Sequence, residues 1–149
     1  MASFLLASLA LVGFDTEEVY FEIPQPEVLV TIIPQPVIVE VIPLVRVSAY
    51  NPVPRQTWGD PSVSSCGPNL ERQIAVSRDL FFDANGNKHL CGTVVTVVTD
   101  RGEEFSEYVI WDTMHPRYTN TADILLPTED ESVAFAFGIT RGQLLIHGN

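Results

Sequence analysis

A run of seven β-branched residues, 93–99 (TVVTVVT), favours a β-strand and disfavours a helix. The sequence Asp-Arg-Gly at 100–102 marks a turn, and residues 107–111 return as a second β-rich run, so the two runs predict a hairpin. Residues 45–50 alternate apolar and polar side chains, which is typical of a half-buried strand. Further strands are expected at 73–76 and 143–147.

One helix is expected late in the chain. Thr128 and Glu131 have the spacing of a capping box, and acidic residues fill the first turn that would follow. Gly138 stands where a helix often ends in a left-handed residue. Several short strands with one helix, in a chain of 149 residues, predict a mainly β protein built as a small barrel rather than a layered α/β domain.

The barrel is placed at 44–149, behind two other segments. Residues 1–14 hold a short apolar run, whereas crossing a bilayer takes about 20 residues. No integral membrane span is therefore expected. The length of the run suits a signal peptide, although no Lys or Arg precedes it. A signal peptide and a buried or docking N-terminal segment both remain open.

Residues 15–43 form a proline-rich segment with a repeat of about ten residues, in which Ile-Pro-Gln-Pro occurs at 23–26 and again at 33–36. The prolines exclude a helix and favour polyproline II or edge-strand geometry. The many valines and isoleucines favour an extended arm that adds strands to its own domain or to a protein partner, including a second copy. A semi-rigid stalk is the alternative.

Charge and composition exclude several function classes. The formal net charge is -11 with only 8 Lys+Arg, so nucleic-acid binding is not expected. Cys66 and Cys91 allow one disulfide in an exported protein or two buried thiols. The three histidines are scattered, and neither a metal site nor a cofactor is expected.

Two aspartates mark the candidate site. Asp112 and Asp123 each stand where an apolar run meets a polar loop, which predicts two carboxylates at strand ends. Two carboxyl groups with different pKa values are what acid/base chemistry on a glycosidic bond requires. Loop-capping carboxylates are the competing interpretation in a chain with 19 acidic residues. The sequence around Asp112 also resembles an aspartic-protease elbow, but Met114 replaces the required glycine, and a second elbow would exist only if the chain dimerised.

Read in order, residues 45–147 resemble the three-aspartate domain, the double-psi β-barrel module of membrane-bound lytic transglycosylase A and related exported and phage proteins. Residues 47–50 are similar to its opening strand, and residues 91–95 to its Gly-Thr strand. Asp112-Thr113 and Ala122-Asp123-Ile124 match its last two aspartates. The Gly-Thr strand and the later aspartate also resemble rare-lipoprotein-A and expansin barrels, which share this fold.

The resemblance implies a six-stranded double-psi β-barrel with one short helix, preceded by the proline-rich arm. It implies a lytic transglycosylase-like enzyme that cleaves peptidoglycan glycan strands without a cofactor. Asp123 would act as general acid and then base, and Asp112 would stabilise the transition state. Asp60 would be the first aspartate, although it stands two residues late, and a turn residue is the alternative. Met114-His115-Pro116 replaces the glycines usual after the second aspartate.

The candidate substrate-binding residues are Tyr50, Thr57, Trp58 and Thr113. The aromatic rings could stack on sugars or belong to the core, and Trp58, in a polar loop, is the better candidate for stacking. The alternative function is a non-catalytic barrel, either a cell-wall-binding module or a virion- or tail-associated structural component. With a signal peptide the protein would be periplasmic or extracellular, and without one it would be phage-associated.

Overall fold

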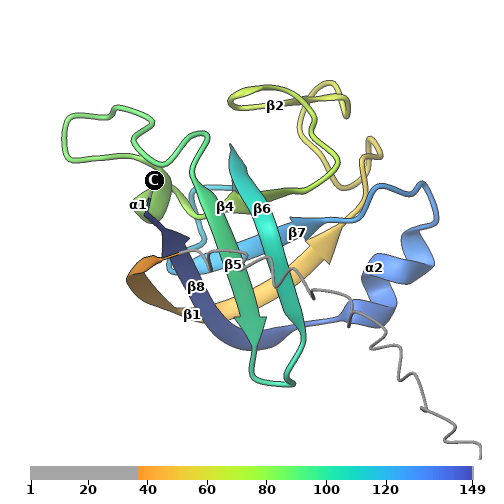
Figure 1. The fold of residues 1–149 in the computed structure, drawn as a ribbon. Coiled ribbons are helices and arrows are strands. Elements are labelled where there is room, and N and C mark those ends of the chain that lie inside the picture. Colours follow the sequence, from red (N-terminus) through yellow and green to blue (C-terminus); the bar gives the residue numbers. More distant parts are fainter. Residues whose placement is uncertain (1–36, 149) are drawn as a thin grey trace, which may run out of the picture. The chain divides into compact units, whose positions relative to one another are not determined.

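The computed structural model describes residues 37–148. The predicted signal segment and most of the predicted arm lie outside the described residues. Six strands close into a barrel in the order β1-β7-β4-β6-β5-β8 (Figure 1). The barrel strands are β1 (Ile38–Tyr50), β4 (Gln73–Val76), β5 (Val94–Thr99), β6 (Glu104–Thr113), β7 (Thr121–Leu125) and β8 (Thr140–His147). A two-stranded sheet of β2 (Val63–Ser64) and β3 (Gly67–Pro68) and two helices, α1 (Arg78–Phe81) and α2 (Glu131–Phe137), complete the fold.

The strand order has an internal two-fold pattern. Strands β1 and β7 are parallel, as are β4 and β6, whereas the other neighbouring pairs are antiparallel. Exchanging β1, β4 and β5 with β6, β7 and β8 leaves both the order and every strand direction unchanged. The barrel therefore consists of two interlocked three-stranded halves. This is the double-psi arrangement, and the predicted fold class is confirmed.

Strand β1 begins before the predicted start of the barrel. Residues 38–44 pair with β8, and β7 pairs with β1 only from Arg46 onward. The predicted boundary at residue 44 thus falls inside β1. Pro43 is compatible with this strand because β7 does not pair with its position, so no ladder bond requires the missing N–H group.

The inside of the barrel is packed with aliphatic side chains. Val47, Ile74, Ile110, Ile124 and Leu144, one from each of five strands, are all fully buried. Burial of such side chains from water is the main stabilising contribution to a fold of this kind. Between the neighbouring strands β5 and β8 the backbones approach closely at one point, and a Cβ atom at Gly142 would lie 2.3 Å from the carbonyl oxygen of Val98. Glycine is therefore required at this crossing.

The predicted hairpin and helix are both present, with local differences. Strands β5 and β6 pair antiparallel across the predicted turn. Helix α2 is capped by Asp130 rather than by Thr128, because the Asp130 carboxylate accepts the Ser132 N–H. Gly138 ends α2 with a positive φ of 67°. The short helix α1 was not predicted. No helix in the described part of the chain is long and apolar enough to span a membrane.

Candidate functional site

A row of four side chains crosses four neighbouring strands. Ser48 of β1 is the register partner of Asp123 of β7, and Asp123 is the partner of Ala75 of β4. Ala75 is in turn the partner of Asp112 of β6. Residues paired across a sheet point their side chains to the same face, so all four share one face. The two candidate aspartates therefore flank Ala75, with Cα atoms two strand spacings or about 10 Å apart.

This face is the outside of the barrel. Ala122 and Ile124, on either side of Asp123, are fully buried in the barrel core, so the Asp123 side chain points the other way. A second apolar cluster lies on the same face and contains Tyr50, Ala75, Met114 and Leu125. The carboxyl group of Asp123 thus stands on an apolar floor.

A β-bulge at Trp111 gives Asp112 its orientation. Ile74 pairs with Ile110, but the next residue, Ala75, pairs with Asp112, so Trp111 is an extra residue in β6. Without this insertion Asp112 would lie level with Val76 and would face the barrel core, because side chains alternate along a strand. Because of the bulge, the Asp112 side chain points to the groove instead of into the barrel core.

Trp111 is held in place by the loops around it. Its indole Nε1 donates a hydrogen bond of 2.8 Å to the Pro68 carbonyl, and its own carbonyl accepts the Cys66 N–H at 3.0 Å. The ring packs against the backbone at Gly92. Cys66 and Cys91 form a disulfide, which is the first of the two alternatives that the sequence left open. The disulfide ties the β2–β3 loop to the segment before β5.

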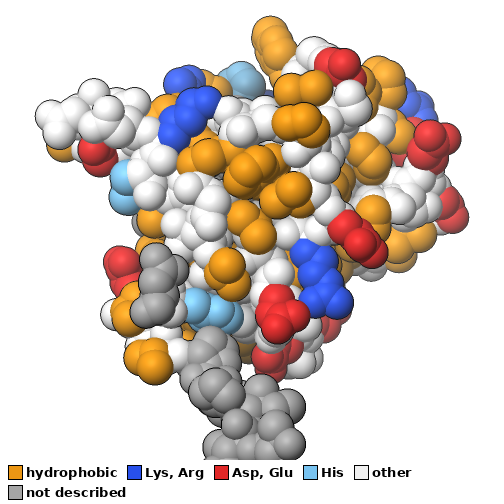
Figure 2. All heavy atoms as spheres, turned by 45° about the horizontal axis from the view of Figure 1, so that its top comes forward, with side chains coloured by type: hydrophobic (Ala, Val, Ile, Leu, Met, Phe, Trp, Pro, Cys, Tyr) orange, Lys and Arg blue, Asp and Glu red, His pale blue; other side chains and the backbone are white. Residues whose placement is uncertain are grey.

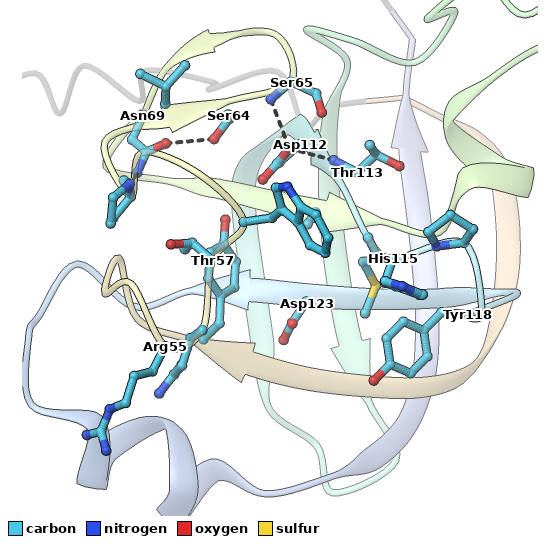
Figure 3. Close-up of a pocket in the computed structure, with 18 of the residues that line it drawn as sticks. Arg55, Thr57, Ser64, Ser65, Asn69, Asp112, Thr113, His115, Tyr118 and Asp123 are labelled. Atoms are coloured by element: carbon cyan, nitrogen blue, oxygen red, sulfur yellow. Dashed lines mark hydrogen bonds between the residues drawn. The ribbon is translucent and has the colours of Figure 1, made fainter.

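The row forms the floor of a groove of about 850 Å³. Figure 2, which brings the top of Figure 1 forward, shows apolar side chains gathered near the centre of the visible face and charged ones around them. In Figure 3, Asp123 lies between Arg55 and Thr57 on one side and His115 and Tyr118 on the other, with Asp112 above it. The groove is also lined by Tyr50, Trp58, Ser64, Ser65, Ala75, Thr113, Met114, Pro116 and Arg117.

Asp123 has the properties of a proton donor. Its side chain is partly buried, and Ser48 Oγ donates a hydrogen bond of 2.9 Å to its Oδ1. Burial raises the pKa of the Asp123 carboxyl to about 6, while the Ser48 hydrogen bond and the positive charge of Arg46 act in the opposite direction. A carboxyl group with this pKa is protonated in an appreciable fraction of molecules near neutral pH and can give up its proton.

Asp112 is anchored through one oxygen. Its Oδ1 accepts the backbone N–H groups of Ser65 and Thr113, both at 2.8 Å. Its Oδ2 receives no hydrogen bond from the described residues. Two charge-assisted bonds hold the carboxylate in one orientation at the groove wall. The same bonds attach the β2–β3 loop to the end of β6.

Tyr50 supplies a hydroxyl group to the groove. Its Oη accepts a hydrogen bond of 3.1 Å from Nε2 of the buried Gln73, which also donates to Ser64 Oγ at 2.8 Å. Burial raises the pKa of the Tyr50 phenol, and the negative charges of Asp112 and Asp123 raise it further. The phenol therefore keeps its proton and can donate a hydrogen bond to a ligand.

Three other predicted residues also lie along the groove. Trp58 is 93% exposed, an arrangement that leaves its ring free for a partner. Thr57 and Thr113 direct their hydroxyl groups to the carbonyls of Val53 and Val76.

Asp60 is placed differently from the other two aspartates. It does not line the groove, and its carboxylate accepts the N–H and the hydroxyl group of Ser62 at 2.9 and 2.7 Å in a local turn. These hydrogen bonds lower the pKa of the Asp60 carboxyl.

The loop after Asp112, residues 114–117, lines one side of the groove and does not fill it. Met114 is buried beneath the groove, where Thr121 Oγ1 lies 3.1 Å from its sulfur atom. His115 and Pro116 are exposed and line one side. Among residues 37–148, no three His, Cys, Asp or Glu side chains cluster as a metal site.

Ser48, Ala75 and Gln73 were not predicted from the sequence as residues of the site. The alternation in residues 45–50 puts Ser48 on the polar face of its strand, and that in residues 73–76 separates Ala75 from Ile74 and Val76. Neither pattern indicates that the two residues would lie beside an aspartate, because their strands are distant in the sequence.

No protein-family model matches the chain, and no curated protein matches it. Three chains of solved structures match, among them apo expansin from Clavibacter michiganensis. That match has 18% sequence identity and a TM-score of 0.45, and it covers 72% of this chain and 50% of the expansin. The fold is accordingly assigned from the strand order given above.

Proposed function

We propose that this chain cleaves glycosidic bonds in peptidoglycan glycan strands, with Asp123 as general acid. The observation that carries the proposal is a carboxyl group with a pKa of about 6 on the floor of an open groove. The resemblance to the three-aspartate domain supports peptidoglycan as the substrate. An exported or phage-associated location follows from the same proposal.

In the proposed reaction Asp123 acts twice. The protonated carboxyl group gives its proton to the glycosidic oxygen as the bond from that oxygen to the anomeric carbon breaks. The resulting carboxylate then takes the proton of the muramyl 6-hydroxyl group, whose oxygen bonds to the anomeric carbon. An anhydro-sugar end forms, no water is consumed, and Asp123 is protonated again.

The other groove residues have supporting roles. The Asp112 carboxylate stabilises the positive charge that develops on the sugar ring in the transition state. Tyr50 donates a hydrogen bond to a sugar hydroxyl group, and Thr57 and Thr113 can accept one. Trp58 offers an exposed ring on which a sugar can stack. Ala75 leaves space between the two aspartates because its side chain ends at Cβ.

The test is a digestion of purified peptidoglycan with mass spectrometry of the products. The wild-type protein should release anhydromuramyl ends, and Asp123→Asn should release none while remaining folded. Asp83→Asn is the matched control, because Asp83 lies in a turn outside the groove and accepts hydrogen bonds from Asn85 and Asn87. Ordinary reducing ends would indicate a hydrolase instead.

A non-catalytic glycan-binding barrel is the second candidate. It is favoured by Asp112, whose two backbone hydrogen bonds also give it a purely structural role in holding the β2–β3 loop. Such a module would bind glycans through Trp58 and the groove without cleaving them, as part of a cell-wall or virion-associated protein. A folded protein that releases no product at any pH from about 4 to 8, a range that brackets the pKa of Asp123, supports this candidate.

A further inference from the structure

Two arginines beside the groove lack an acidic partner in an acidic protein. Arg55, Arg72 and Arg101 form salt bridges with glutamates. Within residues 37–148, neither Arg46 nor Arg117 has a carboxylate at salt-bridge distance. The chain has a net charge of -11 and only 8 Lys+Arg, so acidic side chains far outnumber the cations that could pair with them.

The guanidinium groups of Arg46 and Arg117 both make cation–π contacts with the ring of Tyr118. The Cζ atom of Arg46 lies 5.1 Å from the centre of the ring, and that of Arg117 lies 4.7 Å from it. Nη2 of Arg117 also donates a hydrogen bond of 2.7 Å to the Tyr118 hydroxyl oxygen. Cation–π contacts restrict the rotamers of both arginines before any ligand arrives, which lowers the entropic cost of binding.

Both arginines keep nitrogen atoms available for a ligand. Arg46 uses its Nε for a long contact of 3.4 Å with Ser48 Oγ, and its two terminal nitrogens donate to none of the described residues. Arg117 uses only Nη2. A guanidinium fork of this kind matches the two oxygens of a carboxylate.

The cluster is next to the proposed acid. The Ser48 hydroxyl group that contacts Arg46 donates to Asp123 Oδ1 at 2.9 Å. Arg117, His115 and Tyr118 all line the groove, and Figure 3 places Tyr118 on the side of His115, with Asp123 between them and Thr57. A group bound by the arginines would therefore lie close to the bond that Asp123 protonates.

We propose that Arg46, Tyr118 and Arg117 form a subsite for a carboxylate carried by the glycan, so that the substrate is an acidic polysaccharide. This inference rests on the proposed function. The carboxylate can belong to the lactyl group of a muramyl residue that carries no peptide, or to the ring of a uronic acid. The subsite recognises the same chemistry in both cases.

The experiment measures binding by calorimetry at low ionic strength, with the full chain carrying Asp123→Asn so that no cleavage occurs. The probes are a muramyl tetrasaccharide with free lactyl carboxylates, its methyl ester, and a tetrasaccharide of galacturonic acid. We expect the better of the two acids to bind about tenfold to hundredfold more tightly than the ester. The acid that binds more tightly identifies the source of the carboxylate.

Arg46→Gln and Arg117→Gln should each reduce the preference for acid over ester, and Arg117→Lys should restore part of it. Arg78→Gln is the matched control, because Arg78 lies over the Phe82 ring at 5.2 Å but does not line the groove. Equal binding of acid and ester, no binding of either acid, or an equal loss in Arg78→Gln would each overturn the subsite. Failure to cleave peptidoglycan with the preference intact would overturn only the proposed enzyme activity.

Discussion

The pKa of Asp123 predicts a pH-dependent change in stability when this residue is replaced by asparagine. Its carboxyl has a pKa raised from 3.8 to about 6 in the folded protein. The stability that this proton provides is complete below pH 3.8, falls as the pH rises, and is lost above pH 6. A difference of about two pH units corresponds to about 3 kcal/mol in the free energy of unfolding.

Asp123→Asn removes the titrating group and keeps an oxygen that can accept the Ser48 hydroxyl. The free energy of unfolding of the variant, relative to the wild-type protein, should therefore increase by about 3 kcal/mol between acidic and neutral pH. Urea unfolding followed by tryptophan fluorescence at a series of pH values measures this difference. Subtracting the free energy of unfolding of the wild-type protein from that of the variant at each pH removes the contribution of every other titrating group that the substitution does not affect.

The control for this experiment is Asp83→Asn, for which the sign is opposite. Hydrogen bonds from the Asn87 side chain and backbone lower the pKa of the Asp83 carboxyl, so the stability that it provides is present at neutral pH and is lost as the pH falls. A relative stability of Asp123→Asn that is constant, or that decreases with rising pH, would refute the argument that burial raises the pKa of this carboxyl.

Three further predictions concern activity and the fold. In the proposed reaction Asp123 must carry a proton, so the kcat/KM for peptidoglycan cleavage should fall as the pH rises above about 6, and a rate that keeps rising to pH 8 would contradict that role. Replacing Cys66 and Cys91 by serine opens a loop with a sequence separation of 25 and should lower the free energy of unfolding by about 3 kcal/mol in denaturant melts, whereas no change would mean that the bond contributes nothing. Gly142→Ala should lower the melting temperature by several degrees because its Cβ meets Val98, while Gly86→Ala, in open space, should cost less even though Gly86 has a positive φ of 81°.

Much of the architecture could be predicted because strand and turn signals are local. The β-branched run at 93–99 and the following turn predict the hairpin of β5 and β6, and Gly138 ends the late helix with a positive φ. The position of Asp112 near the end of β6 was also a local inference, whereas Asp123, expected at a strand end, lies in the middle of β7. The start of β1 was placed too late, since prolines in the sequence suggested a boundary that pairing with β8 overrides.

The composition of the groove could not be predicted in the same way. Ser48, Ala75, Asp112 and Asp123 become neighbours only through register between β1, β7, β4 and β6. A shift of one residue in any pair would turn a side chain to the opposite face. The bulge at Trp111 is such a shift, and no local pattern in residues 104–113 predicts it.

The amino-acid sequence alone predicted five of the six barrel strands, the turn between β5 and β6, and the position of Asp112 near a strand end, because each of these depends on neighbours within a few residues. Strand β7, which carries Asp123, was not predicted. Closure of the barrel decided that the carboxylates share one outer face and that one of them is buried enough to hold a proton near pH 6. Desolvation and register are properties of residues that meet across the fold, and they exist only once the chain has closed on itself.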